Sequence, residues 1–281
     1  MPRDVALDTL YNGKINLWVE DELMRTYLGA LWNEPAVKFL IGGGSTGVNA
    51  ILRHAEDAEY KNVFGVADRD HGRSNYADWL VPGRKFTRFI LPRHEIENYL
   101  LDSPALAGCR LNTRRLTAAE IDQILVDEAA TRCWWAACRD AVSLIRERFF
   151  DNYIEHPKMP PVDTEIAARD HITQSDWFRA LPRKSTRMTD DKVLRLLTWT
   201  HKRASRRLDD GSWRVHFSGK EFFRWIGGRI SKRDAASSKQ PSRSGFDADL
   251  AKAVAAWQVG NNAVPADLGV LLKALKARVQ P

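Results

Sequence analysis

The first hundred residues alternate between short apolar runs and segments with helical spacing, and this alternation limits the fold more than any other feature. The apolar runs INLWV, VKFLI, VFGVA and FTRFIL occupy 15–19, 37–41, 63–67 and 86–91. Apolar side chains recur every three or four residues in DELMRTYLGALW, and again from Val48 to Ala55. Strands joined by helices in this way predict a parallel sheet with helices on both faces.

Polar residues mark several expected helix starts. Asp21 and Glu22 stand where the helix dipole favours acids, at the beginning of the first helical segment. Ser45 or Thr46 can cap the helix that follows the triple glycine in GGGSTG. The range Thr117–Glu120 has the spacing of a capping box ahead of a further helical pattern.

The chain changes character after residue 101. The pattern that begins at the capping box is expected to continue through Trp134 and Trp135, as core residues, to Phe150. Loops are expected near Pro157 and Pro241. Further helices are predicted at about 164–171, 176–181, 189–206, 246–259 and 265–279. The fold class is therefore α/β, with a sheet-containing domain at 1–104 and a mainly helical basic domain at 105–281.

Acidic side chains follow three of the four predicted strands. Glu20 ends the first strand, Asp68 and Asp70 end the third, and Glu95 and Glu97 follow the fourth. Because the carboxyl ends of parallel strands form one ligand-binding edge, we expect these carboxylates to gather there and repel one another. Mg²⁺ binds carboxylate oxygens and assists chemistry on phosphodiesters. The sequence thus predicts a Mg²⁺ or Mn²⁺ site, although any one of these acids could instead cap a helix.

The spacing of two of the acids is informative. Asp68 and Asp70 are two residues apart, so on an extended segment their side chains point the same way. Arg69 lies between them and could bind a substrate phosphate or pair with a neighbouring carboxylate. His71 and His94 lie beside the acids, and each could have a catalytic role or only a local hydrogen bond.

The order of these acids resembles the Toprim fold, the metal-binding module of topoisomerases, primases and OLD-type nucleases. The Toprim pattern is a glutamate after the first strand, matched by Glu20 in LWVEDE, and a DxD after the third, matched by Asp68 and Asp70 in GVADRDHG. The segments VEDE, GGGSTG, DRDHG and LPRHEIENYLL are closer still to the Toprim effector subunits of PARIS-type anti-phage systems. The resemblance covers roughly residues 14–102.

This resemblance implies a nuclease that works beside an ABC-type ATPase, which restrains it until a phage protein triggers its release. In the family the HEIENYLL segment supplies further acids, here Glu97 first and Glu95 second. The segment FSGKEFF, with Gly219 and Lys220, resembles a recurring element of these effectors. Since no GxxxxGK[ST] motif is present, ATP would have to bind another chain.

The nuclease interpretation gives each residue a role. Glu20 is expected to be a metal ligand or the base for the attacking water. Asp68 and Asp70 would hold Mg²⁺ from the strand end, and Glu97 would complete a second metal position. Lys220 would stabilise the developing charge or contact a backbone phosphate.

The whole chain has a formal net charge of +7 at pH 7. Its basic residues are concentrated in the C-terminal part. The range 179–243 holds 18 Lys and Arg against 6 Asp and Glu, interleaved with aromatic residues that include Trp199 and Trp213. Such a region attracts polyanions, and the phosphate backbone of DNA or of an RNA such as tRNA is the commonest one. A solvated basic surface over an aromatic core is the alternative.

Other features bear on location and assembly. No run of about 18 apolar residues occurs and the N-terminus lacks an apolar signal core, so we expect a cytoplasmic protein with no membrane partner. The cysteines show no CxxC spacing and are expected to be buried. The long C-terminal helices are expected to form a homodimer in the active state.

Three functions are compatible with these observations. The leading hypothesis is a metal-dependent endonuclease that serves as an anti-phage effector. A DxD glycosyltransferase is the second, but it leaves Glu20 and Glu97 without a role. The third is a catalytically silent nucleic-acid-binding or assembly module, whose carboxylates bind no metal.

Overall fold

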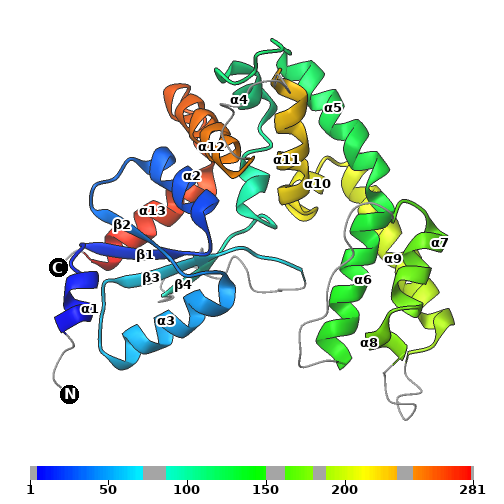
Figure 1. Ribbon diagram of the computed structural model, residues 1–281, viewed down its shortest axis with the longest axis horizontal. Coiled ribbons are helices and arrows are strands. Elements are labelled where there is room, and N and C mark those ends of the chain that lie inside the picture. The colour runs from blue at the N-terminus through cyan, green and yellow to red at the C-terminus, as the bar shows by residue number, and fades with distance from the viewer. Residues whose placement is uncertain (1–4, 72–86, 150–161, 180–187, 233–242, 280–281) are drawn as a thin grey trace. The chain divides into compact units, whose positions relative to one another are not determined.

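The computed structural model describes residues 5–71, 87–149, 162–179, 188–232 and 243–279. The chain forms two compact units. The first contains residues 1–69, 75–121 and 219–281, and the second contains 70–74 and 122–218. Figure 1 labels the elements of both units along the chain.

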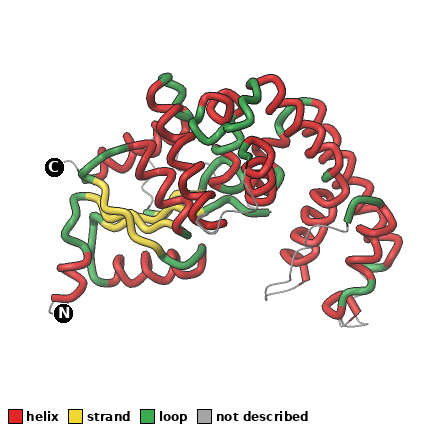
Figure 2. The backbone as a smooth tube through the Cα atoms, turned by 45° about the horizontal axis from the view of Figure 1, so that its top comes forward, coloured by secondary structure: helices red, strands yellow, loops and turns green. Residues whose placement is uncertain are grey.

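The first unit is built on a parallel sheet of four strands, in the order β2-β1-β3-β4. Figure 2 shows these strands in yellow with helices on both sides. The strands are β1 (Ile15–Val19), β2 (Val37–Ile41), β3 (Val63–Ala67) and β4 (Arg88–Ile90). The predicted parallel sheet flanked by helices is confirmed.

The first three strands have the predicted bounds, whereas the fourth is shorter than the predicted 86–91. Residue 86 lies outside the described residues. At the other end, Leu91 still donates its N–H to the carbonyl of Ala67, and Pro92 follows.

Helices from distant parts of the chain complete the first unit. They are α1 (Val5–Leu10), α2 (Glu22–Trp32), α3 (Ser45–Asp57), the 3₁₀ helix η2 (Ile96–Tyr99), α4 (Ser103–Gly108), α11 (Gly219–Ile230), α12 (Arg243–Gly260) and α13 (Ala266–Arg278). Helix α2 packs on α12, where the Tyr27 hydroxyl donates to the Gln258 side-chain carbonyl at 2.8 Å. The sheet unit thus includes the C-terminal helices and does not follow a division at residue 104.

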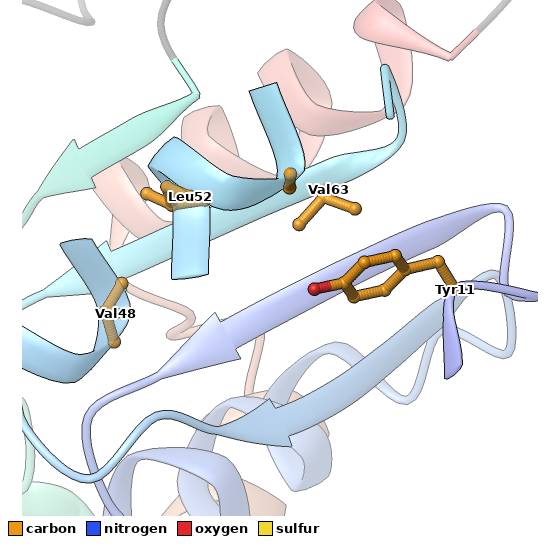
Figure 3. Close-up of a cluster of buried hydrophobic side chains, with 5 residues drawn as sticks. Tyr11, Val48, Leu52 and Val63 are labelled. Atoms are coloured by element: carbon orange, nitrogen blue, oxygen red, sulfur yellow. The ribbon is translucent and has the colours of Figure 1, made fainter. Parts of the chain in front are cut away.

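The two faces of the sheet are covered by different helices. Figure 3 shows Tyr11, Val48, Leu52 and Val63 in one apolar cluster between α3 and the sheet. A Cβ at Gly65 of β3 would lie 2.6 Å from the Val48 side chain and 2.8 Å from that of Leu52. This glycine therefore lets α3 lie close to the strand.

The turn between β2 and α3 differs from its expected form. Gly44, not Ser45 or Thr46, is the N-cap of α3, and no side chain caps the helix. Gly43 and Gly44 have φ of 73° and 97°, which side-chain-bearing residues rarely adopt. The glycines fold the chain back so tightly that backbone conformation, rather than a hydroxyl cap, starts the helix.

The second unit consists of helices. They are part of α5 (Ala118–Thr131), α6 (Cys133–Phe149), α7 (Glu165–Thr173), α8 (Asp176–Arg179), α9 (Asp190–Asp209) and α10 (Trp213–His216). Helices α6, α7 and α9 pack against one another. Trp135 is buried as predicted, whereas Trp134 is half-buried and stacks on the His201 ring, with centroids 3.7 Å apart.

The single helix expected to continue to Phe150 is interrupted at Arg132. The Thr131 hydroxyl donates to the Glu128 carbonyl, and Arg132 N–H bonds three residues back to Ala129. These tighter bonds compete with the α-helical ladder and separate α5 from α6. The expected loops near Pro157 and Pro241 lie outside the described residues.

Two further sequence expectations can be compared with the structure. Cys109, Cys133 and Cys138 are buried free thiols, as predicted. Within the described part of the chain, no helix combines the length and the apolar character needed to cross a bilayer.

Candidate functional site

Two of the predicted acids meet at the carboxyl edge of the sheet. Glu20 follows β1 and Asp68 follows β3, and these strands are parallel neighbours. The Asp68 N–H donates to Glu20 Oε1 at 3.2 Å. The structure thus brings together the glutamate of the first strand and the first aspartate of the DxD, as the sequence predicts.

Asp68 also connects the sheet to the segment after β4. Its Oδ1 accepts the N–H of Ile96, the first residue of η2, at 2.8 Å. Asp68 therefore supplies a hydrogen-bond acceptor to the start of this short helix, in the manner of a cap. The HEIENYLL segment consequently lies next to the strand ends, as the gathering of the acids requires.

Glu95 has a structural role at two helix starts. It is the N-cap of η2, where its carboxylate and the Asn98 side chain form a capping box. Its Oε2 also accepts the backbone N–H of Lys220, at the beginning of α11, at 2.8 Å. A carboxylate is favoured there by the unpaired N–H groups and the dipole of α11.

A close contact explains why the segment FSGKEFF has a glycine, Gly219, at its third position. A Cβ at this position would lie 2.6 Å from the backbone nitrogen of Asn98 and 2.7 Å from its Oδ1. The start of α11 therefore contacts η2 so closely that only glycine fits. This close approach places the Lys220 N–H within reach of Glu95.

Glu97 is the most buried acid of the group, with 4% of its surface exposed against 8% for Glu95. Burial raises the pKa of Glu97 to about 8, and the charges of Glu95 and Asp21 add to this rise, while Lys220 opposes it. Glu97 faces a small pocket of about 150 Å³. The pocket is lined by Asp21, Glu22, Leu23, Glu97, Lys220, Phe223, Arg224, Asp247 and Ala248.

Asp21 links this pocket to the first strand. It is the N-cap of α2, and its Oδ1 accepts the N–H of Met24 at 2.9 Å. It stands one residue before the expected helical position, and Glu22 is the first residue of the helix. Glu22 pairs with Arg25 on the surface. Both acids therefore start the helix, as predicted, while Asp21 also contributes negative charge near Glu97.

Asp70 is not oriented as the extended-strand argument predicts. Its φ is 52° and its side chain is exposed, whereas Asp68 is half-buried. Because the backbone is left-handed at Asp70, the alternation of an extended strand does not apply to this pair. The buried Arg69 donates to the carbonyl of Pro92 at 2.9 Å, so it ties the segment after β3 to the segment after β4.

His71 belongs to a polar cluster of the second unit. Its Nδ1 lies 3.0 Å from Asp140 Oδ1, and Arg139 Nε donates to its Nε2 at 3.0 Å. Since Nε2 accepts, Nδ1 carries the proton and donates to Asp140. Arg207 pairs with the other oxygen of Asp140 at 2.9 Å. Sequence reasoning missed Asp140 and Arg139, because these partners of His71 lie 69 and 68 residues away along the chain.

The electrostatics of this cluster centre on Asp140, whose side chain is 15% exposed. Burial alone would raise the pKa of Asp140, but the hydrogen bond from His71 and the charges of Arg207 and Arg203 lower it to about 2. The His71 side chain is thus held structurally, and His94, the other histidine beside the acids, is buried.

The donor chemistry of the acids fits a hard divalent cation. Glu20, Asp68 and Glu97 offer carboxylate oxygens, and a bound cation would offset the burial of Glu97 and the nearby charges of Glu95 and Asp21. Within the residues that the structure describes, however, no three acidic, histidine or cysteine side chains are grouped closely enough to hold a metal. Glu95 has its carboxylate engaged in capping at two helix starts.

Comparison with known proteins adds no further constraint. No family model matches the chain, and a search of curated proteins finds no match either.

Proposed function

We propose that the chain is a Mg²⁺- or Mn²⁺-dependent endonuclease of the Toprim type. The observation that carries this proposal is the meeting of Glu20 and Asp68 at the carboxyl ends of adjacent parallel strands, joined by a 3.2 Å hydrogen bond. Ligand sites of open parallel sheets lie at this edge. The resemblance of VEDE, DRDHG and LPRHEIENYLL to Toprim effectors supports the same assignment.

Each acid has a role under this proposal. Glu20 and Asp68 would hold the cation, and Glu97 would hold a second ion from the buried pocket. A bound divalent ion would lower the pKa of water and stabilise charge on a phosphodiester. Lys220 lines the same pocket as Glu97 and would contact the substrate phosphate.

The biological setting extends the proposal. By its resemblance to PARIS-type effectors, the chain would be cytoplasmic, act on DNA or on an RNA such as tRNA, and be restrained by an ABC-type ATPase. Activity would require a homodimer. These parts depend on the sequence resemblance rather than on the geometry of the site.

One observation favours a second candidate, a catalytically silent nucleic-acid-binding module. Glu20, Asp68 and Glu95 each accept a backbone N–H, so each has a structural use that needs no metal. A titration with Mg²⁺ separates the two functions. Binding to the folded state adds about 2.7 kcal/mol of stability at 100 times Kd, which raises the unfolding temperature, whereas a silent module gains nothing.

The nuclease is tested by cleavage assays on total tRNA and on plasmid DNA in Mg²⁺. Glu20→Gln keeps the side-chain volume and removes the charge, so cleavage should fall at least about 100-fold. The matched control is Glu56→Gln, at an exposed position of α3, which should cleave like the unmodified chain. Equal cleavage by the Glu20→Gln variant, with an unchanged unfolding temperature, contradicts the proposal.

A further inference from the structure

The outward face of α9 combines cations with an exposed tryptophan. The inward face of this helix buries Val193, Leu197, Thr200 and Ala204. Five outward residues define what we call the α9 stripe: Arg195, Trp199, Lys202, Arg203 and Arg206, all exposed. They recur every three or four residues, so they share one side of the helix over about 16 Å.

Trp199 is not a core residue. It is 51% exposed, whereas Trp135 and Trp213 of the same unit are 1% and 0% exposed. The Arg203 guanidinium carbon lies 5.5 Å from the centroid of the Trp199 ring, at cation–π distance. The helix is anchored by its inward residues, so an exposed indole is not required for packing.

The distribution of charge along α9 favours contact with a polyanion. Its three acids, Asp190, Asp191 and Asp209, stand at the two ends, and every charged residue between them is basic. No ion pair formed within the described residues involves Arg195, Lys202 or Arg206. Arg207 differs, because it pairs with the mostly buried Asp140.

We propose that the α9 stripe binds a single-stranded segment of nucleic acid. An unpaired base stacks on Trp199, and the neighbouring phosphates contact Arg195, Lys202 and Arg206. Stacking on aromatic side chains beside basic residues is the general way in which proteins hold single strands. A duplex offers the phosphates but keeps its bases paired and stacked, so it leaves Trp199 without a partner. The inference deepens the proposed nuclease function by naming an unpaired strand as the substrate feature.

Binding is measured in EDTA, so that it does not depend on metal or cleavage. The probes are fluorescein-labelled 12-nucleotide single-stranded DNA, single-stranded RNA and a DNA duplex, and the readout is anisotropy with the full chain. Trp199→Ala should weaken binding of the single strand about tenfold or more, and Trp199→Phe should restore most of it. Arg195→Gln should reduce the slope of log K against log salt by about 0.7.

Two controls match these variants. Ile166→Ala removes an exposed apolar side chain, 68% exposed, from α7 of the same unit, and should leave binding unchanged. Lys273→Gln removes an exposed cation from α13 and should leave the salt slope unchanged. The inference is supported whether single-stranded RNA or single-stranded DNA binds more tightly than the other, and the comparison identifies the preferred strand.

Any one of three results overturns the inference. The first is binding of the single strand by Trp199→Ala as tight as that by the unmodified chain. The second is equally tight binding of the duplex with the same dependence on Trp199, and the third is competition by polyglutamate as effective as that by the oligonucleotide. Failure of the nuclease is a separate outcome. If Glu20→Gln still cleaves while Trp199→Ala loses binding, only the catalytic proposal fails.

Discussion

Replacing Glu97 by glutamine should make the protein more stable at pH 8 and change little at pH 5. Burial, with the charges of Glu95 and Asp21, raises the pKa of Glu97 from 4.5 to about 8, against the opposing charge of Lys220. Between these values the folded chain keeps a proton that the unfolded chain has released. The unfolded state then binds fewer protons, so the free energy of unfolding falls as the pH rises.

The size of the effect follows from the width of this window. From 4.5 to about 8 is about 3.5 pH units, and each unit changes the free energy of unfolding by about 1.4 kcal/mol, which gives a loss on the order of 5 kcal/mol at pH 8. Glutamine resembles the protonated acid in shape and has no charge. The free energy of unfolding of Glu97→Gln should therefore be several kcal/mol higher than that of the unmodified chain at pH 8.

Urea unfolding in EDTA at pH 5, 6, 7 and 8 measures this difference. Subtracting the two curves cancels the titration of the groups that both chains share. Glu56→Gln, at an exposed site, is the control and should give a flat difference. If the difference in free energy of unfolding between Glu97→Gln and the unmodified chain does not grow with pH, the raised pKa of Glu97 is contradicted. If the pocket binds a cation, adding Mg²⁺ at pH 8 should stabilise the unmodified chain and so reduce the difference in free energy of unfolding between it and Glu97→Gln.

Two other predictions concern the framework of the protein. Asp140→Asn should reduce the free energy of unfolding at pH 7 by about 3 to 5 kcal/mol, because it leaves Arg207 without its buried partner. In the unmodified chain, the contribution from the lowered pKa of Asp140 should be fully present above pH 3.8 and lost as the pH falls towards about 2, as urea unfolding in acid would record. Gly219→Ala should lower stability by about 1 to 3 kcal/mol, since its Cβ would meet the Asn98 backbone 2.6 Å away. Gly228→Ala on the same helix has open space and should raise stability by up to about 1 kcal/mol, so equal melting temperatures for both variants contradict this account.

Much of the sheet could be predicted from local sequence. The runs at 15–19, 37–41 and 63–67 are apolar strands bounded by acids, glycines or polar residues, and each forms a strand with those bounds. Asp21 and the range Thr117–Glu120 start helices where their side chains predict it. These features depend on neighbours along the chain, so the sequence suffices for them.

The candidate site was only partly predictable. The edge at which Glu20 and Asp68 meet follows from the parallel order of the strands, but the sequence could not show that Glu95 caps α11 or that Glu97 is buried. Both depend on Gly219, which lies more than 120 residues further along the chain and brings α11 against η2.

Local sequence accounts for the first three strands, several helix starts and the acids at the strand ends, because these features depend on residues a few positions apart. It took the tertiary structure to show that Glu95 caps α11, that Glu97 is buried and that His71 bonds to Asp140. Burial and hydrogen bonding depend on what packs around a side chain, and those neighbours come from distant segments whose approach is set by the whole fold.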